Sequence, residues 1–115
     1  MFFDNGEYYF GEWKNNYMHG KGIYFHNDFS LYKGYFEFGK KCGKGVEFYF
    51  DYSYYKGNFK DNLKHGKGVK VLDRQNVYNE FWNKGSLIKS EISFKKIKIF
   101  QDFLQNKKIV LQNKN

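Results

Sequence analysis

Apolar and polar residues alternate with a period of two along most of the chain, which is the pattern of β-strands. Residues 9–13 place Tyr, Gly and Trp at every second position, and residues 20–24 place two Gly and a Tyr in the same way. A turn is expected within residues 14–19, where two adjacent asparagines tolerate a left-handed backbone, and a second near residues 27–28. Each such segment predicts two strands joined by a hairpin.

The hairpin pattern repeats every 23 residues. Full units begin at Tyr9, Tyr32 and Tyr55, and a degenerate fourth unit begins at Tyr78. The fifth position of every unit is aromatic, and glycines recur at three further positions. These columns are Trp13, Phe36, Phe59 and Trp82; Gly11, Gly34 and Gly57; Gly20, Gly43 and Gly66; and Gly22, Gly45 and Gly68. Three matching units predict a repeat array rather than a domain of unrelated strands.

Rings and glycines are expected to share one face of this sheet. Because glycine has no Cβ, a glycine on one strand leaves a pocket for the ring of its neighbour, and we interpret these glycines as structural. The opposite face carries Ile23, Val46 and Val69. We therefore expect both faces to bury side chains.

Tyr-x-Gly-x-Trp/Phe followed, after a loop, by His-Gly-x-Gly resembles the pattern of MORN repeats. The resemblance covers residues 1–85 and implies an all-β fold, an elongated single antiparallel sheet of stacked β-hairpins with a shallow groove along it. Phe2 and Phe3 align with the end of a preceding unit. In the fourth unit Glu80 replaces the glycine, and no His-Gly-x-Gly follows Gly85, so we expect the array to end there.

Residues 86–115 differ in composition and are interpreted as a basic C-terminal tail. They carry 7 Lys against Glu91 and Asp102, a formal net charge of 7 − 2 = +5. The apolar residues share about half of a helical wheel and Ser90 suits a helix N-cap, which predicts an amphipathic helix. Residues 96–100 also fit a short strand. The apolar stripe of the tail needs cover from the sheet or from a partner.

The chain has 115 residues, of which 23% are aromatic, and its length fits one domain or one small repeat array. No stretch reaches the roughly 20 apolar residues of a bilayer span, and residues 1–10 do not resemble a secretory signal. A single cysteine, Cys42, favours a reducing compartment. We expect a cytoplasmic protein, with a cytoskeletal or membrane-peripheral location as finer alternatives.

No constellation of residues indicates catalysis. Cys42 occupies the column of His19 and His65, where a packing role is favoured over that of a nucleophile. Those histidines lie two units apart, and successive units are offset by ~10 Å. They are therefore too distant to share a metal ion, whose ligands lie ~2 Å from it. The Gly-Lys-Gly triplets are too short for a phosphate-binding loop. We expect no enzyme activity, metal or cofactor.

Aromatic side chains are the first candidate for partner binding. A single sheet has little interior, so we expect these rings to divide about equally between burial and exposure, in a groove that receives a partner helix or peptide. The resemblance implies a scaffold or adaptor in a cytoskeletal or membrane-associated assembly. A small accessory subunit of a large complex, or a homodimer in which the tail fills the groove, are alternatives. The groove residues are Tyr9, Trp13, Tyr32, Phe36, Tyr55, Phe59, Tyr78 and Trp82.

Lysines are the second candidate. Lys21, Lys44 and Lys67 occupy one column and predict a ladder of cations ~10 Å apart, which fits anionic phospholipid head groups. The tail adds Lys95, Lys96 and Lys98. The simpler interpretation is a solvated face that blunts aggregation. Nucleic acid ranks third, because the net charge of +8 permits it but no known reader motif is present.

Overall fold

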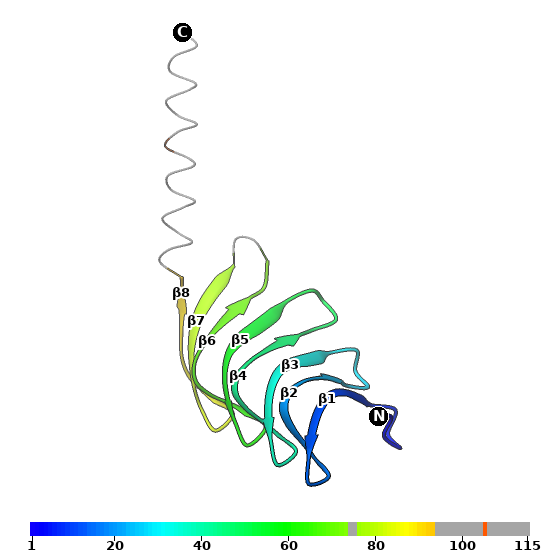
Figure 1. Cartoon of the computed structure of the whole chain (residues 1–115). Coiled ribbons are helices and arrows are strands. Elements are labelled where there is room, and N and C mark those ends of the chain that lie inside the picture. Colours follow the sequence, from blue (N-terminus) through cyan, green and yellow to red (C-terminus); the bar gives the residue numbers. More distant parts are fainter. Residues whose placement is uncertain (74–75, 94–104, 106–115) are drawn as a thin grey trace.

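The computed structural model describes residues 1–73, 76–93 and 105. It contains one antiparallel sheet whose eight strands follow one another in chain order (Figure 1). The strands are β1 (Tyr8–Lys14), β2 (Tyr17–Phe25), β3 (Leu31–Glu37), β4 (Lys40–Phe48), β5 (Tyr54–Lys60), β6 (Leu63–Val71), β7 (Val77–Asn83) and β8 (Ser86–Ile92). The predicted all-β fold and single antiparallel sheet are confirmed.

Two-residue turns join the two strands of each repeat unit, all at the same end of the strands. Both central residues of each turn have positive φ, as in type I′ hairpins, whose twist matches that of the strands. Asn15 and Asn16, with φ of 50° and 66°, confirm the predicted first turn. The other turns hold Phe38 and Gly39, Asp61 and Asn62, and Lys84 and Gly85.

Five-residue turns connect successive units at the opposite end of the strands. His26–Ser30 joins β2 to β3, and Tyr49–Ser53 joins β4 to β5. In both turns the N–H of the first residue donates to the carbonyl of the last at 2.9 Å. The aspartate at the third position, Asp28 or Asp51, accepts the backbone N–H and the hydroxyl of the final serine.

The first residues of the chain reproduce the end of a unit. Phe3–Glu7 closes with an N–H to carbonyl bond of 2.8 Å, like the five-residue turns. Phe2 forms a bridge with Tyr8, and this pair is equivalent to Phe25 and Leu31 one unit later. The predicted alignment of Phe2 and Phe3 with the end of a preceding unit is thus confirmed.

The strands are bent along their length, as Figure 1 shows. The ring centres of Tyr9 and Trp13 lie 5.1 Å apart, although four residues of straight strand span ~13 Å. The pairing register shifts beside the first glycine of each unit, and such bulges increase bending. The bend gives a single sheet an interior on one of its faces.

A continuous stack of rings fills this interior. Tyr9, Phe36, Tyr32, Phe59 and Tyr55 are each at most 4% exposed and meet edge to face, with centroids 5.0–5.5 Å apart. Each buried tyrosine hydroxyl donates to a backbone carbonyl three residues farther along, at 2.8 Å for Tyr32. Rings pack and hydroxyls are satisfied at the same time, which makes this column the core of the protein.

Glycines in the array are of two kinds. A Cβ on Gly45 would lie 2.5 Å from the Tyr32 ring, which confirms the predicted pairing of rings with glycines. Gly11, Gly22, Gly34, Gly57 and Gly68 are equally confined by a tyrosine. The third column, Gly20, Gly43 and Gly66, instead has φ of 62–80° at the bend and faces no ring. A ring pocket is therefore the wrong explanation for that column, whose role is backbone geometry.

The array extends beyond residue 85. β8 pairs with β7 over Ser86–Ile92, and Ser90 lies opposite Glu80. The prediction of Ser90 as a helix N-cap is therefore wrong, because the turn at Lys84 and Gly85 starts a further hairpin without the His-Gly-x-Gly motif. The rest of the predicted helix, residues 94–104 and 106–115, lies outside the described residues.

Candidate functional site

The aromatic residues predicted to form a partner groove lie on the inside of the bend, on what we term the ring face. Tyr9, Tyr32, Phe36, Tyr55 and Phe59 are buried, so the expected equal division between burial and exposure is wrong for these five. The bend of the strands covers them, which the period-two pattern did not reveal. Trp13 is 44% exposed, and Tyr78 and Trp82 are half-buried.

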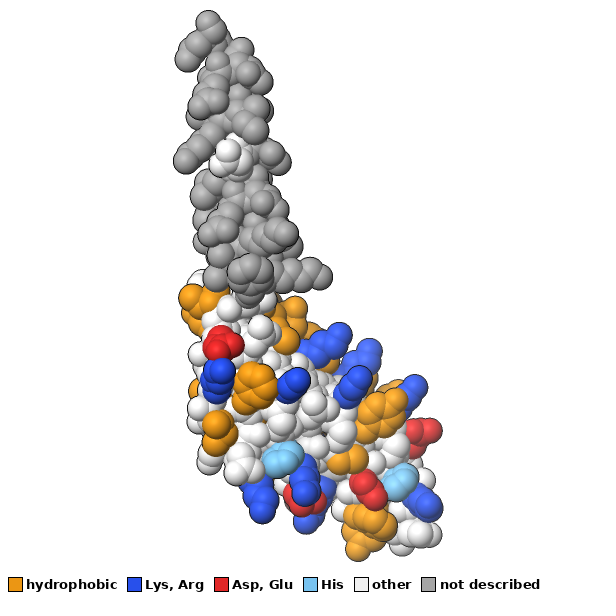
Figure 2. Space-filling view, turned by 90° about the vertical axis from the view of Figure 1, so that its left-hand side faces the viewer, with side chains coloured by type: hydrophobic (Ala, Val, Ile, Leu, Met, Phe, Trp, Pro, Cys, Tyr) orange, Lys and Arg blue, Asp and Glu red, His pale blue; other side chains and the backbone are white. Residues whose placement is uncertain are grey.

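The opposite side of the sheet, the lysine face, carries the predicted ladder. Lys21 pairs in register with Tyr35, Lys44 with Asn58, and Lys67 with Phe81. All three lysines are exposed. Figure 2 looks onto this side of the molecule and shows lysine side chains beside apolar ones. The ladder is thus present in space, and its binding role stays a prediction.

A second row of lysines reinforces the ladder. Lys33 lies between Ile23 and Val46 in the register, and Lys56 lies between Val46 and Val69. Both lysines are exposed, whereas the three aliphatic side chains are half-buried. The face therefore alternates positive charge with apolar surface across successive strands.

A shallow groove of about 1050 Å³ runs across this face from β1 to β6. Backbone of the core glycines lines it together with Phe10, Ile23, Tyr35, Val46 and Phe48. Lys21, Lys33, Lys44 and Lys56 also line it, and none of the described residues in its lining is acidic. A second hollow of about 450 Å³ continues toward β8 beside Lys67 and Phe81 and reaches Glu80 and Glu91. Positive potential thus concentrates over apolar surface in the main groove.

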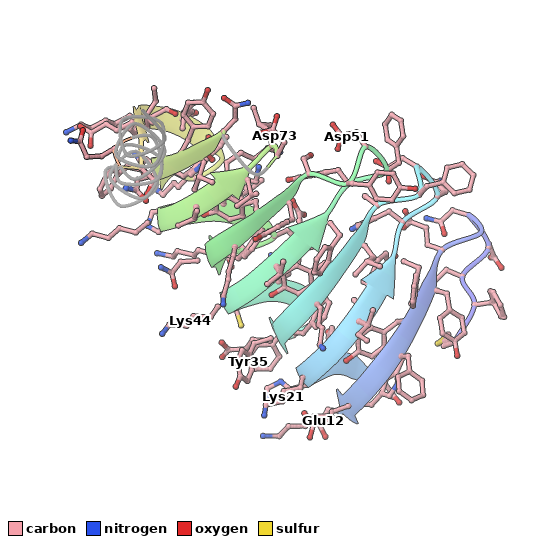
Figure 3. The ribbon with its side chains drawn as sticks, turned by 90° about the horizontal axis from the view of Figure 1, so that it is seen from above. Glu12, Lys21, Tyr35, Lys44, Asp51 and Asp73 are labelled. Atoms are coloured by element: carbon pink, nitrogen blue, oxygen red, sulfur yellow. The ribbon has the colours of Figure 1, made fainter. Side chains whose placement is uncertain are left out.

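The five-residue turns are on the side of the sheet away from this groove. In Figure 3 Lys21, Tyr35 and Lys44 project from one side, and Asp51 and Asp73 lie at the turns on the other. Of the labelled residues, the two lysines thus lie on the side of the groove and the two aspartates at the turns, while Glu12 lies beside Lys21 and accepts its backbone N–H at 2.6 Å.

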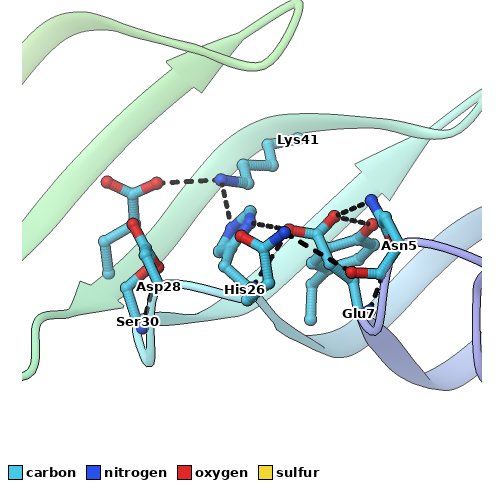
Figure 4. A network of polar contacts seen from close by, with 9 residues as sticks. Asn5, Glu7, His26, Asp28, Ser30 and Lys41 are labelled. Carbon is cyan, nitrogen blue, oxygen red and sulfur yellow. Dashed lines mark hydrogen bonds and ion pairs between the residues drawn. The ribbon is translucent and has the colours of Figure 1, made fainter.

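A chain of ionisable groups crosses the ring face near these turns (Figure 4). Glu7 lies 3.4 Å from Nδ1 of His26, whose Nε2 is 3.1 Å from Nζ of Lys41. Lys41 donates to Glu47 at 2.8 Å, and the Tyr49 hydroxyl donates to the other oxygen of Glu47 at 2.8 Å. Lys41 is only 8% exposed, so this pairing compensates for the burial of its charge.

The pKa of Glu47 reflects this environment. Burial raises the pKa, but the hydrogen bond and charge of Lys41, the Tyr49 hydroxyl and the charge of Lys64 together lower it below the ordinary 4.5. Burial also lowers the pKa of Lys64, whose Nζ lies 4.6 Å from the ring centres of Tyr55 and Trp82. These contacts hold the turns against the ring stack.

Acid is expected to weaken the fold through Glu47. Because its folded pKa lies below its ordinary value, the contribution to stability is complete above about pH 4.5 and is lost as the pH falls through the folded pKa. Glu47→Gln should therefore lower the free energy of unfolding at pH 7 but approach the original protein near pH 3. Urea unfolding at both pH values measures this. Glu37→Gln, at an exposed position, is the matched control, and a Glu47→Gln deficit that persists at pH 3 would contradict the prediction.

The remaining predicted residues fall into three groups. His19 lies 6.1 Å from the Phe38 ring, whereas Nδ1 of His65 accepts the N–H of Lys84, so the two histidines serve different turns. Cys42 is half-buried, and burial raises the pKa of its thiol, with Glu37 and Asp61 adding to the effect. Within the described residues no three His, Cys, Asp or Glu side chains are placed to hold a metal ion. Lys95, Lys96 and Lys98 lie outside the described residues.

Sequence reasoning missed two sets of charged residues. Lys33 and Lys56 border the groove, and Lys41, Glu47 and Lys64 build the polar cluster on the ring face. A signal was available, because Lys33 and Lys56, like Lys41 and Lys64, are 23 residues apart. Only the register of the strands shows which face each pair occupies.

Comparison with known families agrees with the geometry. The model of one family, the MORN repeat, matches residues 9–29, 32–54 and 55–73. The matched segments begin at the core tyrosines Tyr9, Tyr32 and Tyr55, one segment in each of the three full units. A search of the curated proteins finds no match for the chain.

Proposed function

Since the chain belongs to the MORN repeat family, we propose that it is a non-catalytic scaffold or adaptor that binds a partner helix or peptide in the groove of the lysine face. MORN repeats are generally modules for contact with proteins or membranes, and proteins built from them are generally non-catalytic. The finer setting we propose is a cytoskeletal or membrane-associated assembly.

One observation supports this groove above all. It joins apolar side chains and four lysines over about 1050 Å³, and none of the described residues in its lining is acidic. A partner that matches it carries acidic side chains beside apolar ones. Repeated units place equivalent lysines ~10 Å apart, which suits an extended or helical segment lying along the array.

The basic tail is a poor occupant of this groove. Residues 93–115, which follow β8, carry six lysines against Asp102, a formal net charge of 6 − 1 = +5, and the groove is itself positive. Like charges brought together in a partly desolvated site repel, so the tail is disfavoured whether it comes from the same chain or a second copy. We therefore place the partner segment in another protein.

Charge reversal in the groove is expected to abolish partner capture. The triple variant Lys21→Glu, Lys44→Glu, Lys67→Glu reverses two lysines of the groove and the one beside the hollow that continues it, and it leaves the ring stack untouched. A matched triple, Lys14→Glu, Lys40→Glu, Lys60→Glu, makes the same charge change at exposed positions outside the groove. Affinity capture from native cells with mass spectrometry should identify a protein that the original chain and the matched control retain and the groove variant loses. Equal capture by both triples would refute the groove as the site.

Anionic phospholipid is the second candidate, and the exposed lysine ladder is the observation that favours it. Within the described residues no helix has the length and apolarity needed to cross a bilayer. Surface contact alone would contribute ~1 kcal/mol per lysine and weaken with salt. If lipid is the ligand, the original chain sediments with phosphatidylserine vesicles at moderate salt and the groove variant does not. In that case affinity capture finds no protein that the groove variant loses.

A further inference from the structure

The five-residue turns expose aromatic side chains that the core does not use. Phe29 is 88% exposed, Phe50 77% and Tyr52 95%. Phe29 belongs to the turn between β2 and β3, and the other two belong to the turn between β4 and β5. Two strand spacings separate these turns, so the aromatic tips stand ~10 Å apart along the edge. We term this set, with Asp28 and Asp51, the turn edge.

Two of these aromatics occupy a backbone conformation that disfavours them. Phe29 and Tyr52 have φ of 68° and 69°, in the left-handed region where a side chain beyond Cβ is strained. The equivalent position of the Phe3–Glu7 turn is Gly6, with φ of 85°. Glycine thus meets the demand of this turn, and the first two full units carry an aromatic residue there instead.

Packing does not compensate for this strain. At 88% and 95% exposure, Phe29 and Tyr52 gain little from burial. Phe38, which also has positive φ, differs because its ring lies 6.0 Å from Tyr17 on a neighbouring hairpin. Strained residues that add nothing to the fold are characteristic of sites that contact something else.

The charge of the turn edge selects its partner. Asp28 and Asp51 flank the exposed rings, and hydrogen bonds from Ser30 and Ser53 lower the pKa of both carboxyls, which keeps them ionised at neutral pH. None of the described residues of the turns at 3–7, 26–30 and 49–53 is a lysine or an arginine. Lys70 of β6 lies beside the last of these turns, with Nζ 3.9 Å from the Tyr49 ring centre, and its charge adds to the lowering of the Asp51 pKa. The lysine face lies on the other side of the sheet (Figure 3). An acidic and aromatic edge complements a segment that is basic and apolar.

From this geometry we propose that the turn edge is a second interaction surface, which binds a basic, apolar segment of a protein. Apolar side chains seven residues apart on a helix are ~10.5 Å apart and match the two aromatic tips. Lysines or arginines of the same segment face Asp28 and Asp51. With an acidic partner in the groove and a basic one on the turn edge, the array joins two proteins of opposite charge.

The test uses a defined basic, apolar probe. A fluorescent synthetic peptide of lysine, glutamine and leucine, with leucines seven residues apart, is positively charged and apolar on one helical face and does not occur in this chain. Titrated with the full-length chain, it should bind, and binding should weaken with added salt. In the double variant Phe29→Gly, Tyr52→Gly the dissociation constant should rise at least tenfold while the melting temperature rises, because the strain is removed. A structural role for the rings would lower the melting temperature instead.

Two controls separate this surface from the groove. Lys21→Gln, Lys44→Gln, Lys67→Gln should bind the basic peptide as the original chain does, whatever happens to capture by the groove. A peptide with every lysine replaced by glutamate should not depend on Phe29 or Tyr52. Unchanged peptide binding by the glycine double variant would overturn the proposal. Failure of the original chain to bind the peptide would also overturn the proposal. If Phe29 and Tyr52 instead bind phosphatidylcholine vesicles while the peptide does not bind, the turn edge contacts lipid and the proposal is wrong.

Discussion

Phe36→Ala is expected to destabilise the protein by about 3–5 kcal/mol, the usual cost of truncating a buried phenylalanine. Phe36 is 2% exposed and lies between Tyr9 and Tyr32, with ring centroids 5.2 and 5.1 Å away. Its loss opens a cavity that interrupts the ring stack between the first and second units. Because small domains have only about 5–15 kcal/mol of stability, most of the array should be lost to unfolding at moderate urea concentration.

Urea unfolding followed by tyrosine and tryptophan fluorescence measures this change. Phe38→Ala is the matched control, since it makes the same truncation two residues away at a position that is 63% exposed. We expect the control to change stability by less than about 1 kcal/mol. Similar midpoints for Phe36→Ala and Phe38→Ala would show that the stack is not the core.

The same burial changes how a binding experiment on the ring stack is interpreted. With the aromatic residues taken as the partner groove, a double change of Phe36 and Phe59 to alanine is expected to abolish partner capture and to disturb the fold. In the structure both rings are covered by the bend, so loss of partner capture in that variant would follow from unfolding. The lysine face, whose side chains are exposed, allows the binding site to be changed while the core is kept.

Most of the fold follows from local features of the sequence. The 23-residue repeat predicts the strands, and asparagines such as Asn15 and Asn16 mark a turn that requires positive φ. The tyrosine and glycine columns predict the pairing that places Gly45 under Tyr32. These features depend on neighbours within one or two units, which is why spacing alone identifies them.

The bend and the extent of the array could not be predicted in the same way. A strict period of two assumes straight strands, and it does not show that a bulge beside Gly34 turns the strand over its own rings. The same assumption is the reason why the aromatic side chains were predicted to be half-exposed. β8 was missed because Ser86–Ile92 lacks the glycine motif, although the Lys84–Gly85 turn is sufficient to start it.

The candidate site could be predicted only in part, because it depends on which face of the sheet each charged side chain occupies. Lys21 and Lys44 were recognised as a column, but Lys33 and Lys56 join them only through the register of β3 and β5 with their neighbours. Exposure of Phe29 and Tyr52 and the sign of their φ are likewise properties of the folded turn. The separation of a basic groove from an acidic edge is therefore a result of the structure.

Gly45→Val is expected to destabilise the protein by about 1–3 kcal/mol, the usual cost of overpacking, and by more if the ring cannot move. A Cβ at this position would lie 2.5 Å from Cε2 and 2.6 Å from the hydroxyl oxygen of Tyr32. That ring is fully buried between Phe36 and Phe59, with centroids 5.1 and 5.0 Å away. Any displacement also strains the 2.8 Å hydrogen bond from its hydroxyl to the Tyr35 carbonyl.

Gly43→Asn provides the control within the same strand. Gly43 has φ of 62°, which asparagine tolerates, and a Cβ there would meet no heavy atom within 4 Å. The two substitutions add side chains of similar size two residues apart, so their difference isolates the contact with Tyr32. Thermal unfolding should show a clear fall in melting temperature for Gly45→Val and a much smaller one for Gly43→Asn. If the order were reversed, backbone conformation rather than space beside the ring would explain the glycines of the array.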